Sequence, residues 1–195
     1  MQIEMGISVG LYFGSFNPIH HGHLMIASRI MMDTELDQVW FIVSPQNPFK
    51  SKNTLLNEYH RLHLVRLAID DDPRFRVSDI EFRLPKPSYT SDTLSYLKDE
   101  YPQHEFSLIL GSDSLTNFEK WKNYSYILEE YRIYVYERPG FSVRADLVGN
   151  IVHCKAPILE ISSTDIRSMV AKGKSIRYFV PEAVRDEIEK SHYYR

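Results

Sequence analysis

The chain has 195 residues, of which 43% are hydrophobic and 25% charged, a composition typical of a globular protein rather than a disordered or coiled-coil one. Its 23 basic and 26 acidic side chains give a net charge of −3, which excludes the surplus of positive charge that nucleic-acid-binding proteins carry. The single cysteine excludes a disulfide-stapled secreted scaffold, and no stretch reaches the roughly 20 apolar residues of a membrane-spanning helix. We therefore expect a cytoplasmic enzyme with no nucleic-acid or membrane partner.

Residues 8–13 form the first predicted strand, followed by a loop at 14–20 and a helix at 21–33, because Pro18 forbids helix before it. Further strands are predicted at residues 38–43, 75–82, 105–110, 132–136, 151–154 and 158–161. Further helices are predicted from Asn57 as N-cap to residue 69, from Thr90 or Ser91 as cap to residue 100, and at residues 114–121, 124–131, 162–172 and 181–191, the last with Pro181 at its first position.

This alternation of strands and helices is typical of a parallel sheet with crossover helices. The expected fold class is α/β, a doubly wound and mainly parallel sheet. We find no internal repeat, linker or low-complexity segment, so residues 1–195 are expected to form a single domain, with the helical part at about 162–195 packed on it.

The strongest local pattern is Gly14-Ser15-Phe16-Asn17-Pro18-Ile19-His20-His21-Gly22-His23, where the first strand meets the first helix. Ligands of open α/β sheets bind beyond the carboxyl ends of the strands, and a helix N-terminus favours an anion there. Two imidazoles three residues apart can both donate to one phosphate, with Gly22 keeping the space between them open.

Three other interpretations of this segment compete with phosphate binding. The histidines could simply cap the helix and pack against it. A zinc site would need a supporting cysteine or glutamate ligand nearby, which the segment does not offer. A dinucleotide-binding fingerprint would need three glycines in another arrangement and an acidic residue about 20 positions later, so it fails here.

The segment resembles the phosphate-binding motif of the nucleotidylyltransferase superfamily, Gly-x-Phe-x-Pro-x-His-x-Gly-His, at every fixed position. Near the other end, Ser162, Thr164, Ile166 and Arg167 resemble the second motif of that superfamily, Ser-x-Thr-x-Ile-Arg. Taken alone, these hydroxyls either cap a helix or hold phosphate oxygens, with Arg167 one turn further in. Two motifs in the expected order identify the chain as a member of the superfamily with its Rossmann-like fold.

Within the superfamily, the chain is similar to bacterial nicotinate-nucleotide adenylyltransferases. Residues 88–93, with the sequence Ser-Tyr-Thr-Ser-Asp-Thr, resemble a family element that meets the pyridine nucleotide, although on physics alone they form a helix cap. Gly111-Ser112-Asp113 followed by Trp121 resembles the strand end and the pyridine-side tryptophan of that family, since an indole can stack on a pyridinium ring. The chain departs from the family at Phe49, where a histidine is often found.

The resemblance implies transfer of the adenylyl group of ATP to nicotinate mononucleotide, which yields nicotinate adenine dinucleotide and pyrophosphate in NAD biosynthesis. It implies catalytic roles for His20, His23 and Arg167. The other residues expected at ATP are Gly14, Ser15, Phe16, Gly22, Gly111, Asp113, Ser163 and Thr164, and those expected at the pyridine nucleotide are Lys50, Thr90, Trp121 and Arg138. Mg²⁺ is expected to arrive with ATP, without a metal site of the protein's own.

Two alternatives stay open at this point. One is an adenylyltransferase for another acceptor, nicotinamide mononucleotide or phosphopantetheine. The other is a regulator that binds nucleotides without catalysis. The sequence leaves the preference for nicotinate over nicotinamide and the oligomeric state open, a homo-oligomer included.

Overall fold

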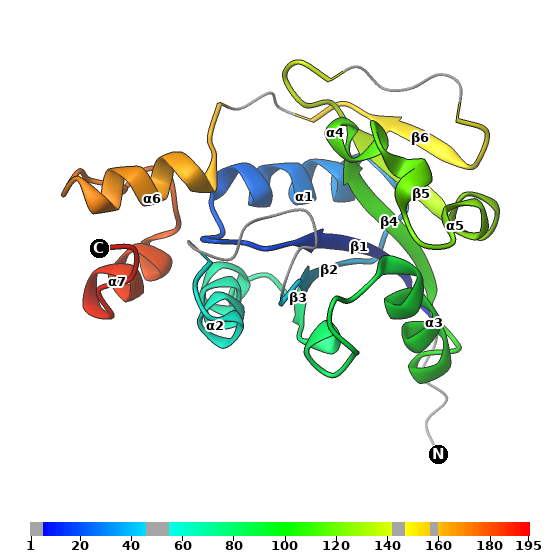
Figure 1. Cartoon of the computed structure of the whole chain (residues 1–195), viewed down its shortest axis with the longest axis horizontal. Coiled ribbons are helices and arrows are strands. Elements are labelled where there is room, and N and C mark those ends of the chain that lie inside the picture. The colour runs from blue at the N-terminus through cyan, green and yellow to red at the C-terminus, as the bar shows by residue number, and fades with distance from the viewer. Residues whose placement is uncertain (1–5, 46–54, 142–146, 157–159) are drawn as a thin grey trace.

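Six strands form one sheet in the computed structural model, which describes residues 6–45, 55–141, 147–156 and 160–195. The strand order is β3-β2-β1-β4-β5-β6, every neighbouring pair is parallel, and the order reverses between β1 and β4 (Figure 1). The strands are β1 Ser8–Gly14, β2 Gln38–Val43, β3 Phe75–Ser78, β4 Glu105–Gly111, β5 Arg132–Tyr136 and β6 Ile151–Cys154. The predicted doubly wound α/β class is confirmed.

Helices cover both faces of this sheet, as the apolar side chains on both sides of the central strands require. One face packs against α1 (His21–Asp33), α2 (Glu58–Ile69), α6 (Ser163–Ala171) and α7 (Glu182–Lys190). The other packs against α3 (Thr90–Glu100), α4 (Ser112–Leu115), the 3₁₀ helix η3 (Phe118–Lys120) and α5 (Tyr124–Glu130). Alternate residues of one strand serve the two sides: Tyr12 of β1 belongs to the first core and Leu11 to the second.

The C-terminal helices extend the first core. Ile166 of α6 and Val184 and Ile188 of α7 are buried in the same cluster as Ile30 of α1 and Val65 of α2. In Figure 1, α6 and α7 lie together at one end of the molecule, beside α1 and α2. This packing brings the C-terminal segment to the carboxyl end of β1, where the first motif lies.

Two predicted elements are shorter than the sequence indicated. The strand predicted at 75–82 ends at Ser78 and is followed by the 3₁₀ helix η2, Ile80–Phe82, because the chain turns at Asp79, whose carbonyl accepts from Phe82 N at 2.8 Å. The helix predicted at 114–121 is divided into α4 and η3, separated by Thr116 and Asn117, both weak helix formers.

Helix ends account for the remaining differences. Asn57 caps α2 as predicted and accepts from Tyr59 N at 2.9 Å, but α3 has Tyr89 as its N-cap, with Thr90 already in the first turn. Pro181 is the N-cap of α7 rather than its first helical residue. Of the strand predicted at 158–161, residues 158–159 lie outside the described part of the chain, and residues 160–161 are not in a strand.

Candidate functional site

Two stacked imidazoles occupy the start of α1. His20 is the N-cap residue and only 5% exposed, and its ring centroid lies 3.7 Å from that of His23, with 29° between the planes. Gly22 makes this arrangement possible, because a Cβ at that position would lie 2.9 Å from His20 Nδ1. His23 also meets the ring of Phe16 edge to face, at 5.1 Å between centroids. The first motif therefore folds into one compact cluster.

Burial sets the protonation state of His20. It lowers the pKa of the imidazole from 6.5 to about 4, with smaller contributions from the positive charges of Arg138 and His21. His20 is therefore neutral near pH 7 in the protein without ligand. A neutral imidazole carries one donor nitrogen, which suits a ligand with acceptor oxygens such as a phosphate.

The second motif lies against the first. Ser163 Oγ donates to the carbonyl of Pro18 at 2.9 Å, and Arg167 Nη1 donates to the carbonyl of Asn17 at 2.7 Å. Arg167 Nη2 also donates to Thr164 Oγ1 at 3.2 Å. Ser162, the N-cap of α6, accepts from the backbone of Asp165 at 3.1 Å, so the capping interpretation is confirmed for this residue. Residues about 145 positions apart thus form one surface around residues 14–20.

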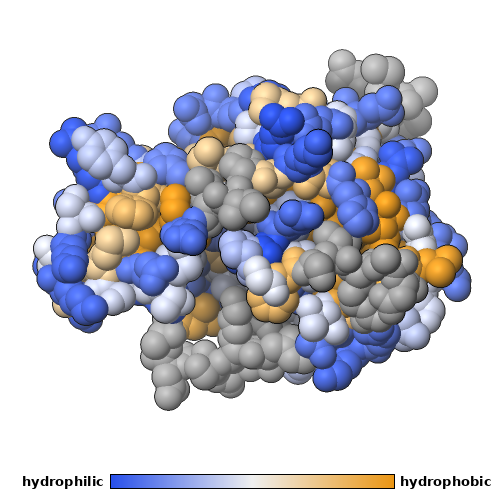
Figure 2. Space-filling model, turned by 90° about the horizontal axis from the view of Figure 1, so that it is seen from above, coloured by the Kyte–Doolittle hydropathy of each residue, from blue (hydrophilic) through white to orange (hydrophobic). Residues whose placement is uncertain are grey.

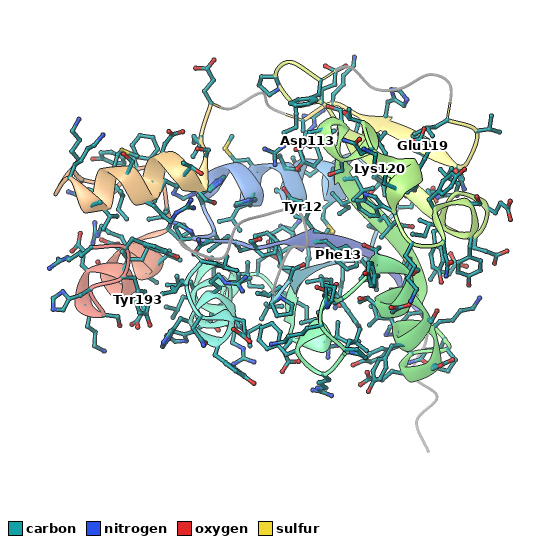
Figure 3. The ribbon with its side chains drawn as sticks, in the orientation of Figure 1. Tyr12, Phe13, Asp113, Glu119, Lys120 and Tyr193 are labelled. Atoms are coloured by element: carbon teal, nitrogen blue, oxygen red, sulfur yellow. The ribbon has the colours of Figure 1, made fainter. Side chains whose placement is uncertain are left out.

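A third group follows β4 and β5. Arg138 Nε lies 3.6 Å from Asp113 Oδ1, and Arg138 Nη2 donates to the hydroxyl of Tyr136 at 3.3 Å. Tyr136 shares a hydrogen bond of 3.2 Å with Tyr12 of β1, and Figure 3 shows Tyr12 on its strand with Asp113 at the start of α4. A Cβ at Gly111 would meet the side chains of both Asp113 and Arg138, so a larger residue there would displace this pair.

The position of Arg138 differs from the grouping made on the sequence. The sequence places Arg138 with the residues expected at the pyridine nucleotide, and in the structure it lies beside Asp113 and Gly111, which are expected at ATP, close enough to His20 to lower its pKa. The reason is that β5 is the direct neighbour of β4 in the sheet, so the residues that follow the two strands meet at one edge.

The segments of Thr90 and Trp121 are joined by an ion pair. Lys122 Nζ lies 2.8 Å from Asp92 Oδ1 and 5.2 Å from the ring centroid of Tyr89. The indole of Trp121 packs on Phe118 at 4.9 Å between centroids and stays partly exposed. The start of α3 and the tryptophan segment therefore lie close together. Lys50 and Phe49 lie outside the described residues.

Two buried ionisable residues were missed on the sequence. Glu81 accepts hydrogen bonds from Ser88 Oγ at 2.9 Å and Thr93 Oγ1 at 3.0 Å, and also from the Ser44 hydroxyl; burial raises its pKa. Arg61 is fully buried and donates to backbone carbonyls of the site loops. One signal could have found Arg61, since it is four residues before Val65 on the buried stripe of its helix. Nothing in the local sequence marks Glu81.

Within the described ranges, no group of three or more histidine, cysteine or carboxylate side chains is arranged to hold a metal ion. None of the helices in the described ranges combines the length and apolar character needed to cross a membrane. The face seen in Figure 2 is mostly hydrophilic, with separate hydrophobic patches.

Comparisons with known proteins agree on one family. The family model described as cytidylyltransferase-like matches residues 11–169. A probable nicotinate-nucleotide adenylyltransferase of Cytophaga hutchinsonii is 52% identical over 96% of this chain and 98% of the relative. Proteins with the same description from Flavobacterium psychrophilum, at 49% identity over 97% of this chain and 100% of the relative, and Bacteroides fragilis, at 51% over 94% and 95%, are also similar.

Solved structures share the fold. A Plasmodium falciparum nicotinic acid mononucleotide adenylyltransferase complexed with NaAD superposes with a TM-score of 0.80 at 21% identity, covering 96% of this chain and 97% of that one. The same enzyme complexed with APC gives a TM-score of 0.79 at 20% identity, with the same coverage.

Proposed function

The chain belongs to the nicotinate-nucleotide adenylyltransferases, a family of nucleotidyltransferases in NAD biosynthesis, and we propose that the site around His20 and His23 transfers the adenylyl group of ATP to nicotinate mononucleotide. An oxygen of the mononucleotide phosphate forms a bond to the α-phosphorus of ATP, and the bond from that phosphorus to the pyrophosphate breaks. The products are nicotinate adenine dinucleotide and pyrophosphate. ATP enters as its Mg²⁺ complex, in which the cation offsets part of the phosphate charge. We infer that the reaction takes place in the cytoplasm, an expectation that rests on the single cysteine of the chain.

One observation carries the assignment of residues: both motifs meet at residues 14–20. Ser163 and Arg167 hydrogen-bond to the carbonyls of Pro18 and Asn17, within the loop that leads to His20. A triphosphate bound over this loop would have imidazoles on one side and hydroxyl and guanidinium donors on the other. This arrangement supports His20 and His23 at the α- and β-phosphates, and Ser163, Thr164 and Arg167 at the departing pyrophosphate.

One nitrogen of the His20 ring is enclosed by the protein. Its Nδ1 edge faces Gly22 and has no hydrogen-bond partner among the described residues, so Nε2 is the nitrogen left to meet a phosphate oxygen. Because burial keeps the ring neutral, His20 would meet a phosphate oxygen through a hydrogen bond and not through a full positive charge. The attacking phosphate is already an anion, so the reaction needs positioning and charge stabilisation more than a general base.

The remaining contacts divide into two sets. The loop residues Gly14, Ser15 and Phe16, together with Gly22, Gly111 and Asp113, would border ATP. The charge of Arg138, beside Asp113 and near His20, supports a role on the phosphate side. Thr90 and Trp121, joined through Lys122 and Asp92, would hold the pyridine nucleotide, and Lys50 would reach its phosphate.

The test is pyrophosphate release by the purified protein with Mg-ATP and one acceptor at a time: nicotinate mononucleotide, nicotinamide mononucleotide or phosphopantetheine. We expect fast release with nicotinate mononucleotide. His20→Ala should lower kcat by about 100-fold while the circular dichroism spectrum is retained, the scale typical of removing one charge-stabilising donor. Release with a different acceptor would overturn the acceptor assignment, and ATP binding without release would favour a nucleotide-binding regulator.

A further inference from the structure

A completely buried arginine lies beneath the site loops. Arg61 is in the first turn of α2 and its side chain is 0% exposed. The guanidinium donates four hydrogen bonds to backbone carbonyls: Nε to Leu56 at 2.8 Å, Nη1 to Ser15 at 2.6 Å and to Ser44 at 2.8 Å, and Nη2 to Pro45 at 3.0 Å. Four of its five N–H donors are therefore used on the main chain of other segments.

Three of these four carbonyls lie just beyond the carboxyl ends of β1 and β2. Ser15 belongs to the loop after β1, while Ser44 and Pro45 directly follow β2. The two strands are neighbours, with Gly14 opposite Val43, and Ser44 N donates to the carbonyl of Gly14 at 2.9 Å. Arg61 thus joins the carboxyl ends of two adjacent parallel strands, which is the edge where ligands of such sheets bind.

The bond to Ser15 fixes the orientation of one peptide group. The C=O and N–H of a trans peptide point in opposite directions, so a Ser15 carbonyl held on Arg61 turns the amide of Phe16 away from α2. Phe16 itself has a φ of +44°, a left-handed conformation that a side-chain-bearing residue adopts only when its surroundings hold it there. At the next residue, Asn17 Oδ1 accepts from Leu56 N at 3.2 Å, so Leu56 is tied to the loop and to Arg61 alike.

Lysine would not reproduce this arrangement. The four carbonyls are arranged around a planar fork, whereas an ammonium is a single point with three donors. Burial lowers the pKa of Arg61 to about 10, which leaves the guanidinium protonated at neutral pH. The side chain therefore contributes both a rigid shape and a positive charge under the loop.

We propose that Arg61 is a positioning residue for adenylyl transfer, which holds the loop of residues 14–20 in the geometry that receives the phosphates of ATP by donating to the carbonyls of Ser15, Ser44, Pro45 and Leu56. The proposal rests on the proposed function of that loop. Arg61 touches no substrate; it acts through the backbone that does.

The test combines Arg61→Ala with rescue by free guanidinium. We expect folded Arg61→Ala to lose at least about tenfold in kcat with ATP and nicotinate mononucleotide, since a small misplacement of reacting groups costs this much or more. Guanidinium chloride at low millimolar concentration, far below denaturing levels, should restore part of kcat in this variant and none in the wild type. Urea at the same concentration serves as the solvent control. Arg66→Ala, an exposed arginine of the same helix, is the matched control and should keep wild-type activity.

The measurements distinguish a positioning role of Arg61 from a purely structural one. Wild-type kcat and KM in folded Arg61→Ala, or guanidinium that raises its unfolding midpoint without raising kcat, would overturn the proposal and leave Arg61 a purely structural residue. If Arg61→Ala does not fold, Arg61→Lys replaces it, and wild-type turnover in that variant would overturn the proposal equally. If wild type and Arg66→Ala both fail to release pyrophosphate, the proposed function fails; guanidinium-dependent recovery of ATP binding by Arg61→Ala still tests the loop geometry separately.

Discussion

The neutral, buried His20 makes protein stability depend on pH in a defined window. Its pKa is about 4 in the folded protein and ordinarily 6.5, so between these values the unfolded chain binds more protons than the folded one. Stability contributed by His20 is therefore fully present above pH 6.5 and is lost as the pH falls toward 4. At 1.36 kcal/mol per pKa unit, the full shift corresponds to about 3 kcal/mol, of which about 2 kcal/mol is lost by pH 5.

The assay is urea unfolding of wild type and His20→Gln at pH 7.5 and pH 5. Glutamine does not titrate, so the change with pH should be smaller in the variant, and the difference between the two proteins isolates His20 from every other titrating group. We expect the wild type to lose about 2 kcal/mol more than His20→Gln over this interval. His153→Gln, which removes an exposed imidazole from β6, controls for loss of a histidine as such.

Parallel pH curves for wild type and His20→Gln would refute the reasoning, because they would mean that His20 titrates alike in the folded and unfolded states. The ring would then be charged at mildly acidic pH, and burial beside Arg138 would not lower its pKa. A titration of the imidazole Cε1–H signal that is missing in His20→Gln gives the same answer directly.

Three further predictions concern other parts of the site. Gly22→Ala should lower kcat at least about tenfold in pyrophosphate release without unfolding the protein, because the new Cβ displaces the ring of His20; unchanged kcat would contradict this. Trp121→Ala should raise KM for nicotinate mononucleotide far more than for ATP, with Trp121→Phe in between, whereas equal rises would exclude stacking on the pyridine ring. Burial raises the pKa of Glu81, so the stability that this carboxyl group contributes is present below its ordinary pKa of 4.5 and is lost as the pH rises through the raised pKa. Glu81→Gln should therefore gain stability relative to wild type as the pH increases, measured by urea unfolding. A difference in stability that stays constant with pH would contradict the raised pKa of Glu81.

Local patterns in the sequence predicted the strands, helices and loops whose formation depends on residues close together in the chain. The strands of the sheet centre are buried on both faces and so appear as short apolar runs, and the bounds of α1, β2, β5 and β6 agree with the prediction. Pro18, Gly14 and Gly22 placed the loop of residues 14–20 between β1 and α1, because its shape depends on residues next to one another. The stacking of His20 on His23 follows from their spacing on the first turn of a helix.

Contacts between distant segments could not be predicted in this way. Glu81 lies in a segment predicted as strand, and only the turn at Asp79 directs its carboxylate inward to Ser88 and Thr93. The grouping of Arg138 depended on which strand neighbours β4, which the order of elements along the chain does not state. Tyr194, second from the C-terminus, donates to Asn17 Oδ1 at 3.0 Å across 177 positions. Such hydrogen bonds depend on the topology of the fold, so no short stretch of the sequence predicts them.

Two guanidinium groups hold the loop of residues 14–20, and they show why these distant contacts matter for the proposed chemistry. Arg61 donates to the carbonyl of Ser15 and Arg167 to that of Asn17, and within the described residues neither forms an ion pair with a carboxylate. Carbonyl oxygens satisfy the donors without cancelling the net positive charge. The same bonds that hold the loop in shape therefore leave two cations beside it, where a polyphosphate gains from both. Since Arg61 is buried and Arg167 is half-buried, salt screens their charges only weakly, and this attraction should persist at physiological ionic strength.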